Sequence, residues 1–367
     1  MKIKVMTVLG TRPEIIRLSL VIKKLDEYCE HILVHTGQNF DENLSAVFFR
    51  DLGLREPDYR LGVEGSTSGE QIGKMIIETE KVISKERPDR ILVLGDTNSG
   101  MVSIIAKRMG IPVFHMEAGN RCFDYRVPEE VNRTIIDHCS TILLPYTYRS
   151  KENLLNEGIA GEFIYVIGNP IYEVIEYYSK EIESSKALAD LGVESREYFL
   201  TTMHRAENVD DKDRLGNLLT GLDNIREKYS VPVVCSLHPR TKSKIERFGL
   251  EPNSRNILLS TPFGFFDFIA LEKNALCVIT DSGTVQEECS IFKAPNVTIR
   301  DVTERPETIE CGSNMLTSTI PDLMLEAVGI ALNEQCEWEA PSGYLDRNVS
   351  SRVVKIILGY LRNISAY

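Results

Sequence analysis

The stretch KVMTVLGTRPEIIRLSLVIKKLDEYCEHILVH, residues 4–35, decides the fold class. Residues 4–9 and 31–35 are short apolar runs typical of buried strands, and residues 13–28 between them have the apolar spacing of a helix. Strand, helix and strand in this order predict a βαβ unit with parallel strands. Pro13 stands near the first helical position, where proline is favoured.

The same alternation continues along the chain. Further strands are predicted at 90–95, 112–116, 141–145 and 163–168, and a second series at 198–203, 231–237, 256–260, 275–280 and 295–299. The predicted helices include 68–86, 98–109, 128–139, 212–228, 283–292 and 321–334. These strands are more than a single sheet usually contains. We therefore expect two α/β domains with a boundary near residue 170. From the pattern alone, the last helix, 349–366, could belong to either half.

Composition narrows the class of protein. The 367 residues include 42 Lys and Arg against 54 Asp and Glu, a net charge of −12, which argues against a dedicated nucleic-acid binder. No apolar stretch approaches the roughly 20 residues of a membrane span, and the start is too short and too charged for a signal peptide. The eight cysteines lack C-x-x-C spacing and mostly lie in apolar runs, so we expect reduced thiols and a cytoplasmic protein.

Polar residues directly follow seven of the predicted strands. In parallel sheets ligands bind at the carboxyl ends of the strands. Turn chemistry explains any one such segment, but seven together predict one polar cleft formed by two facing sheets. The segments are 10–14, 36–38, 96–98, 117–121, 204–208, 238–240 and 281–284.

Two of these segments start helices and predict anion sites. Free backbone N–H groups at 10–13, beside Arg12, would bind an anion, although a plain turn with a solvated arginine is equally compatible. At Ser282-Gly283-Thr284 small residues would let a diphosphate approach, with Ser282 as the N-cap and Glu287 or Glu288 accepting from ribose hydroxyls. An ordinary capping box is the alternative there. Neither segment is G-x-G-x-x-G or a Walker loop, so a classical dinucleotide or ATP site is not supported.

Acidic residues near one arginine predict proton-transfer chemistry. Glu129 and Arg133 are four residues apart on one helical face, and Glu117 and Asp96 end strands on the same side of the sheet. Three carboxylates near one guanidinium would shift one another's pKa, as acid-base catalysis requires. The alternative is that acids in a first helical turn complement the helix dipole.

The histidines do not predict a metal centre, because no Cys/His cluster appears among the six. His204 and His238 follow strands and have basic neighbours, which suits contact with phosphate. There is no G-x-S-x-G or other nucleophile signature.

Taken in order, these pieces resemble the non-hydrolysing UDP-N-acetylglucosamine 2-epimerase family. The motifs are GTRPE (10–14), HTGQ (35–38), GDT (95–97), HMEAG (115–119), PEEVNR (128–133), MHRAEN (203–208), HP (238–239), DSGTVQEE (281–288) and TERPE (303–307). The resemblance implies an α/β fold of two Rossmann-like domains with parallel sheets facing across a cleft, similar to GT-B glycosyltransferases. It also implies that the C-terminal helix, 349–367, joins the domain of residues 1–170, that 171–348 form the nucleotide-binding domain, and that the protein is a homodimer.

Finer features resemble one branch of this family. Residues 37–61 and 117–130 resemble the corresponding segments of enzymes that make UDP-N-acetyl-L-fucosamine from a 6-deoxy-L-talose nucleotide sugar. The sequence departs from the UDP-N-acetylglucosamine pattern at Arg17, where that branch has Lys, and at Ser282-Gly283-Thr284, which replaces Ser-Gly-Gly. The segment between Asn120 and Pro128 is also two residues shorter. The sugar therefore stays open between these two types.

The resemblance assigns roles to particular residues. Acid-base work falls to Asp96, Glu117 and Glu129, with His204 as a further catalytic residue. The diphosphate would be held by Arg12, His204, Ser282, Gly283 and Thr284, the ribose by Glu288 and the sugar site by Arg133, with Phe263 beside uracil and Gln38 and His238 among the substrate-binding residues.

The implied reaction is C2 epimerisation by elimination of UDP to a 2-acetamidoglycal and re-addition. It requires no cofactor, and its partners are a UDP-N-acetyl sugar and UDP. The product would serve surface polysaccharide synthesis, of capsule or O-antigen type. A GT-B glycosyltransferase, a hydrolysing 2-epimerase and a non-catalytic nucleotide-sugar binder are the alternatives.

Overall fold

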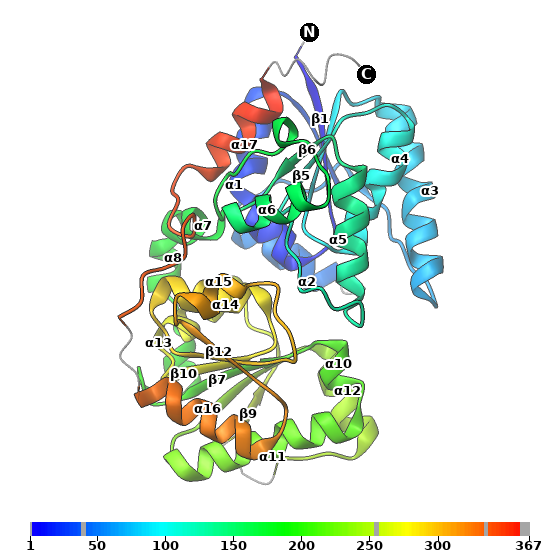
Figure 1. Ribbon diagram of the computed structural model, residues 1–367. Coiled ribbons are helices and arrows are strands. Elements are labelled where there is room, and N and C mark those ends of the chain that lie inside the picture. Colours follow the sequence, from blue (N-terminus) through cyan, green and yellow to red (C-terminus); the bar gives the residue numbers. More distant parts are fainter. Residues whose placement is uncertain (1, 38–41, 253–256, 334–336, 360–367) are drawn as a thin grey trace. The chain divides into compact units, whose positions relative to one another are not determined.

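The computed structural model describes residues 2–37, 42–252, 257–333 and 337–359. The chain divides into two compact units, Met1–Val174 with Ser342–Tyr367, and Ile175–Pro341. Each unit contains one six-stranded parallel sheet flanked by helices (Figure 1). The helix α7 (Ile171–Tyr177) crosses from the first unit into the second. Within the described ranges, none of the helices has both the length and the apolar character that crossing a bilayer requires.

The first sheet has the strand order β3-β2-β1-β4-β5-β6, which is the Rossmann order. Its strands are β1 (Lys4–Leu9), β2 (Glu30–His35), β3 (Tyr59–Arg60), β4 (Arg90–Leu94), β5 (Val113–Met116) and β6 (Ile142–Leu144). The helices are α1 (Arg12–Tyr28), α2 (Glu42–Asp51), α3 (Ser68–Glu86), α4 (Val102–Arg108), α5 (Pro128–Cys139), α6 (Tyr148–Asn156) and α17 (Val349–Leu358), with 3₁₀ turns η1 (Asn98–Met101) and η2 (Gly161–Phe163). The chain reverses direction across the sheet between β1 and β4, so this point is the expected ligand crevice.

The second sheet repeats this order as β12-β11-β10-β7-β8-β9, with its switch point between β7 and β10. Its strands are β7 (Phe199–Met203), β8 (Val233–Leu237), β9 (Ile257–Ser260), β10 (Cys277–Thr280), β11 (Asn296–Ile299) and β12 (Asn314–Thr317). Its helices are α8 (Ser179–Glu183), α9 (Ala187–Leu191), α10 (Ala206–Val209), α11 (Lys212–Tyr229), α12 (Pro239–Phe248), α13 (Phe265–Asn274), α14 (Gly283–Phe292), α15 (Pro306–Glu310) and α16 (Pro321–Asn333).

Apolar cores hold the helices against both sheets. In the first unit, Met6 and Val8 of β1 pack in one cluster with Val82 of α3, Val102 of α4 and Ile136 of α5. In the second unit, successive strand residues face opposite layers, as the pleat requires. Phe199 packs with α11 and α16, and Leu200 packs with α13 and α14.

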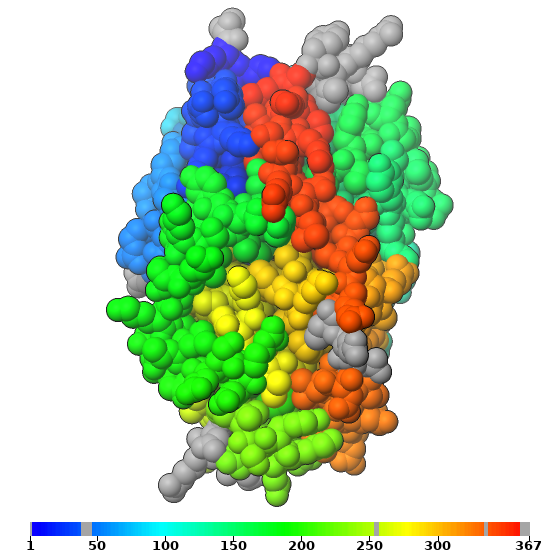
Figure 2. Space-filling model, turned by 90° about the vertical axis from the view of Figure 1, so that its left-hand side faces the viewer, coloured from blue at the N-terminus to red at the C-terminus, as the bar shows by residue number. Residues whose placement is uncertain are grey.

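The C-terminal helix completes the first unit. Helix α17 packs against α1, and Lys24 Nζ donates to Ser351 Oγ at 2.5 Å. Figure 2 shows this red segment beside the blue N-terminal residues. Four apolar residues of α17 are buried, namely Val349, Val353, Val354 and Ile357. The domain boundaries near residues 170 and 349 stay predictions. The compact units divide between residues 174 and 175 and between residues 341 and 342.

Four elements differ from the sequence expectation. Residues 163–168 do not form the predicted strand; the 3₁₀ turn η2 is followed by an extended segment joined to β6 by the bridge Leu143–Ile164. The edge strands β3 and β12 were not predicted, because β3 has two residues and β12 (NMLT) lacks a long apolar run. The predicted helix 98–109 begins as the 3₁₀ turn η1 before α4.

Candidate active site

Asp96 and Arg133 form the centre of the carboxyl edge of the first sheet. Asp96 follows β4, and its Oδ2 lies 2.5 Å from Nη2 of Arg133, which projects from α5. Arg133 is 2% exposed, and its Nη1 donates to Glu130 Oε2 at 2.6 Å. Asn132 Nδ2 also donates to the main-chain oxygen of Asp96 at 3.0 Å. The aspartate is therefore held from both its side chain and its backbone.

Glu117 lies beside Asp96 at the end of the next strand. The register pairs Leu94 of β4 with Met116 of β5, so the two strands end together. A Cβ built on Gly95 would lie 3.8 Å from Glu117 Oε2. Glu117 has a φ of +66°, a backbone conformation that is uncommon for a non-glycine residue and concentrates at functional sites.

The Glu117 carboxylate has three neighbours that were not predicted to contact it. Arg17 Nη1 of α1 lies 3.6 Å from Oε2, Asn120 Nδ2 donates to Oε1 at 3.2 Å, and the Tyr146 hydroxyl donates to Oε2 at 3.5 Å. Arg17 is 3% exposed, so each of the two predicted acids is accompanied by a buried guanidinium. In the sequence, Arg17 is a departure from a branch pattern, and no spacing indicates its contact with Glu117.

The predicted convergence on Arg133 needs one correction, because the buried acid that pairs with Arg133 on α5 is Glu130. Glu130 is 2% exposed and also accepts from the backbone N–H groups of Cys122 and Phe123. Glu129 lies half-buried in the first turn of the same helix. The i,i+4 spacing favoured Glu129, but the i,i+3 spacing of Glu130 is equally short on a helix and was the missed signal.

At the start of α1, two of the backbone N–H groups predicted to be free for an anion already have an acceptor in the protein. Glu14 Oε2 accepts from the N–H groups of Gly10 and Thr11 at 3.0 and 2.7 Å, which completes a capping box. Its Oε1 accepts from the Thr97 hydroxyl at 3.0 Å. Burial of the Glu14 carboxyl raises its pKa to about 7, despite these hydrogen bonds.

Arg12, the first residue of α1, keeps a position compatible with its predicted contact to an anion. It is partly buried, and its guanidinium carbon lies 5.8 Å from the centre of the Phe48 ring. Burial lowers the pKa of Arg12 from its ordinary value. Gln38, also predicted to bind substrate, lies outside the described residues.

In the second unit, Asp281 ties together the two loops at the switch point. The buried carboxylate accepts from the backbone N–H groups of His204 and Arg205, which follow β7, and lies 3.0 Å from His204 Nδ1. Burial alone would raise the pKa of Asp281, but His204 and the two N–H groups lower it to about 2. Asp281 is thus an ionised anchor that fixes the backbone and ring of His204.

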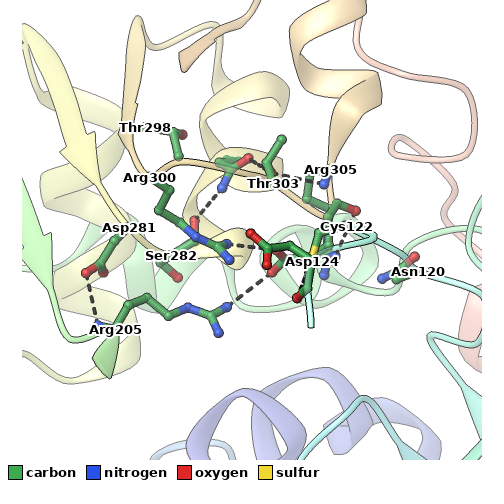
Figure 3. A network of polar contacts seen from close by, with 12 residues as sticks. Asn120, Cys122, Asp124, Arg205, Asp281, Ser282, Thr298, Arg300, Thr303 and Arg305 are labelled. Atoms are coloured by element: carbon green, nitrogen blue, oxygen red, sulfur yellow. Dashed lines mark hydrogen bonds and ion pairs between the residues drawn. The ribbon is translucent and has the colours of Figure 1, made fainter. Parts of the chain in front are cut away.

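Arginines and one carboxylate surround the start of α14, as Figure 3 shows for Arg205, Arg300 and Arg305 near Ser282. Glu304 Oε1 accepts from Arg205 Nη2 at 3.1 Å, and its Oε2 accepts from Arg300 Nη1 at 2.7 Å. A Cβ on Gly283 would lie 2.6 Å from Glu304 Oε1, so this carboxylate lies against the helix start. Glu304 belongs to the TERPE motif (303–307), but the sequence alone indicated no role for it.

Of the predicted residues at the start of α14, Thr284 is partly exposed and the others are buried. Ser282 is the N-cap residue, but its predicted capping hydrogen bond is absent within the described chain; its hydroxyl lies 3.0 Å from that of Thr284. Glu287 is fully buried and bonded to Arg305, which excludes it as the ribose ligand. Glu288 is 6% exposed, and burial and the Glu288 charge raise the pKa of its neighbour Glu272 well above the usual value.

The two remaining predicted residues lie on other loops of the second unit. His238 is the N-cap of α12, where its Nδ1 accepts from the backbone N–H of Arg240, and its ring centre lies 6.4 Å from that of His204. Phe263 is partly buried against the core cluster of α13 and α14. The structure therefore brings His204 and His238 together.

Two Rossmann-like units, each with charged residues at the carboxyl ends of its strands, define a GT-B-like enzyme of nucleotide-sugar chemistry. Residues 23–358 match the UDP-N-acetylglucosamine 2-epimerase family. The chain belongs to this family and is an isomerase.

Similar proteins cover almost the whole chain. UDP-N-acetylglucosamine 2-epimerase of Methanocaldococcus jannaschii is 42% identical over 96% of this chain and 98% of its own. Its crystal structure in complex with UDP-GlcNAc and UDP has a TM-score of 0.92, covering 97% of this chain and 99% of that one. UDP-2,3-diacetamido-2,3-dideoxy-D-glucuronate 2-epimerase of Pseudomonas aeruginosa is 38% identical over 96% of this chain and 99% of its own. The predicted class of fold and the predicted isomerase class are confirmed.

Proposed function

We propose that the protein inverts C2 of a UDP-2-acetamido sugar without hydrolysis, through elimination of UDP and its re-addition. The C2 proton has no adjacent carbonyl group, so direct removal of this proton is very difficult. Elimination avoids this problem: the C1–O bond breaks as a carboxylate takes the C2 proton, leaving a 2-acetamidoglycal and UDP. Protonation of C2 from the opposite face and re-addition of UDP at C1 then give the epimer.

The observation that carries this proposal is the pairing of Asp96 and Glu117 at the ends of neighbouring strands. A reaction that removes a proton from one face and returns one to the other needs two acid-base groups close together. Asp96 is bonded to Arg133 and Glu117 lies 3.6 Å from Arg17, so both carboxylates have fixed positions. We assign acid-base work to these two and to Glu129, and orientation of the sugar to Arg133.

The leaving diphosphate is assigned to the second unit. An anion is stabilised at a helix N-terminus, and the start of α14 has small residues with Arg205 and Arg300 nearby. We assign the diphosphate to Ser282, Gly283, Thr284 and His204, with Arg12 of the first unit as a further cation. Glu288 is assigned to the ribose, and His238 and Phe263 to the remainder of the nucleotide.

Deuterium incorporation tests this mechanism. The protein is incubated with substrate in D₂O, and both epimers are analysed by ¹H NMR. We expect deuterium at C2 in the product, with the sugar still attached to UDP, because the proton returned to C2 comes from solvent. Epimer without deuterium at C2 would exclude the elimination route. Free sugar would indicate the hydrolysing relative, and transfer to an acceptor without exchange would indicate a glycosyltransferase.

For the sugar, we propose the 6-deoxy-L-talo nucleotide sugar of the N-acetyl-L-fucosamine branch, with UDP-N-acetylglucosamine as the second candidate. Residues 37–61 and 117–130 support the first. The name of the Methanocaldococcus jannaschii relative supports the second. Running the D₂O assay on each sugar, and on UDP-2,3-diacetamido-2,3-dideoxy-D-glucuronate because of the Pseudomonas relative, identifies the substrate by its higher kcat/KM.

The wider context follows from the same proposal. We propose that the enzyme acts in the cytoplasm as a homodimer and supplies a surface polysaccharide precursor. The seven cysteines of the described residues are free thiols, as suits a reducing compartment. Light scattering in solution tests the dimer.

A further inference from the structure

Three buried charged side chains lie directly behind Asp96 and Glu117 in the first unit. His115 of β5 and Asp137 of α5 are at most 1% exposed, and Arg121 is 4% exposed. His115 Nδ1 lies 2.8 Å from Asp137 Oδ1, and Arg121 Nη2 lies 2.8 Å from Asp137 Oδ2. None of the three has a role in the proposed reaction.

Both ring nitrogens of His115 face acceptors. Nε2 lies 2.8 Å from the main-chain oxygen of Gly95, which can only accept, so Nε2 must carry a proton. Nδ1 faces the Asp137 carboxylate, which accepts unless it is itself protonated. A neutral imidazole has one N–H group and cannot donate to both. The ring is therefore an imidazolium, or Asp137 is a neutral acid that donates to Nδ1.

The surroundings of Asp137 favour the ionised carboxylate. Its Oδ2 accepts from the backbone N–H of Gly119 at 3.1 Å in addition to the Arg121 contact. Arg121 is positively charged whatever the state of the ring, so its buried guanidinium beside Oδ2 favours the ionised carboxylate. The proton shared by His115 and Asp137 therefore belongs to the ring.

The same network holds the backbone on both sides of the two acids. His115 bonds the oxygen of Gly95, the residue before Asp96. Asp137 bonds the N–H of Gly119, and Arg121 Nη1 donates to the oxygen of Asn120 at 2.7 Å, both shortly after Glu117. Gly95 and Gly119 have φ angles of +74° and +80°, a backbone conformation that glycine adopts readily and residues with a side chain do not.

We propose that His115 is a buried imidazolium that, with Asp137 and Arg121, positions Asp96 and Glu117 relative to each other. It touches no substrate and is a positioning residue rather than a catalytic one. The proposal rests on the proposed function, because it concerns the spacing of the acids that exchange the C2 proton. Displacing a reacting group by about 1 Å can cost about 100-fold in rate, so such support is expected to affect kcat.

The first test observes the ring directly and does not depend on activity. In ¹⁵N-labelled protein, the ring nitrogens of His115, assigned with a His115→Gln variant, are expected to both show the chemical shifts of protonated nitrogen at neutral pH. A single unprotonated nitrogen would overturn the proposal, whatever reaction the enzyme catalyses. His31 is the comparison within the same sheet: it bonds Asp26 at 2.6 Å and the Thr7 hydroxyl at 2.8 Å, and a hydroxyl can donate or accept.

The second test separates positioning from stability. His115→Gln is expected to lower kcat about 10- to 100-fold while KM and the Kd for UDP change less than about twofold, because the nucleotide is assigned elsewhere. The matched control is His31→Gln, which also removes a buried histidine paired with an aspartate but lies at the amino end of the strands. Equal kcat for the two variants, or a His115→Gln loss confined to KM, would contradict the positioning role. A wild-type enzyme without C2 exchange would instead refute the proposed function alone.

Discussion

The two sheets have the same strand order, yet the helices that start at their carboxyl edges differ in what lies against their first turn. In the first unit, α1 follows the central strand β1, and its amides are closed by Glu14 from its own first turn. In the second unit, α14 follows the central strand β10. Its third residue, Val285, stands where α1 has Glu14, and it is 3% exposed in an apolar cluster. One side chain at the third helical position thus decides whether a helix start is filled from within.

The two carboxyl edges therefore have the same architecture and differ in their side chains. At the first edge, the carboxylate of Glu14 accepts from backbone N–H groups at the start of α1, and Asp96 and Glu117 lie at the same edge. At the second edge, the carboxylate near the start of α14 comes from another loop. It belongs to Glu304, which accepts from Arg205 and Arg300. Strand order therefore fixes where a site lies, and the residues after the strands fix its charge.

The largest expected effect comes from breaking the pair of acids at the first edge. Asp96→Asn and Glu117→Gln should each lower kcat for C2 exchange about 1000-fold, because each removes an acid-base group. The Kd for UDP should change less than about threefold, since the nucleotide is assigned to the second unit. Exchange kinetics in D₂O and calorimetry with UDP measure both quantities. Glu162→Gln, an exposed acid on η2, is the control, and full activity in either site variant would contradict the assignment.

A smaller effect is expected from the carboxylate that closes α1. The folded-state pKa of Glu14, about 7, lies above the ordinary 4.5, so the native state binds this proton more tightly than the unfolded chain. Glu14 therefore lowers stability as pH rises from 4.5 to about 7. Over that window, Glu14→Gln should gain about 3 kcal/mol in unfolding free energy relative to wild type.

Urea unfolding of both proteins at several pH values measures this difference. Using the difference between the two proteins cancels the contributions of groups that titrate in both. A constant difference across the window would show that folding does not raise the pKa of Glu14.

The smallest expected effect sharpens the comparison at the start of α14. Arg205→Gln removes a charged donor near the start of α14 and should weaken UDP binding about 10- to 30-fold, which corresponds to one charge-assisted hydrogen bond. Calorimetry with UDP measures the change. Arg247→Gln, an exposed arginine at the end of α12, should leave the affinity unchanged. Equal affinities for both variants would place the diphosphate elsewhere.

Much of the fold could be predicted from periodicity, because the central strands are long apolar runs between amphipathic helices. The edge strands β3 and β12 could not, because two or four residues carry too little pattern. The segment 163–168 has the composition of a strand, yet it is joined to β6 by the single bridge Leu143–Ile164, with backbone hydrogen bonds from Tyr165 to Leu143 and from Ile167 to Pro145. Composition predicts that such a segment is extended, but not how many ladder hydrogen bonds it makes.

The candidate site could be predicted where a residue directly follows a strand, as Asp96 and Glu117 do. It could not be predicted where a distant loop supplies the partner. Glu304 follows β11 and reaches α14, and the Arg17–Glu117 contact joins α1 to the end of β5. Such contacts depend on how layers pack, which local spacing does not encode. The capping box at Glu14 was readable from Thr11 and Glu14, but the expectation of free amides overlooked it.

The position of α17 has a consequence for biosynthesis. Because residues 342–367 belong to the unit that begins at Met1, the ribosome must produce all of the second unit before the first can be finished. Until then, the side of α1 that α17 covers stays without its partner, whereas residues 175–341 can assemble as soon as they emerge. A nascent chain halted before α17 should therefore contain a complete C-terminal unit and an aggregation-prone N-terminal one.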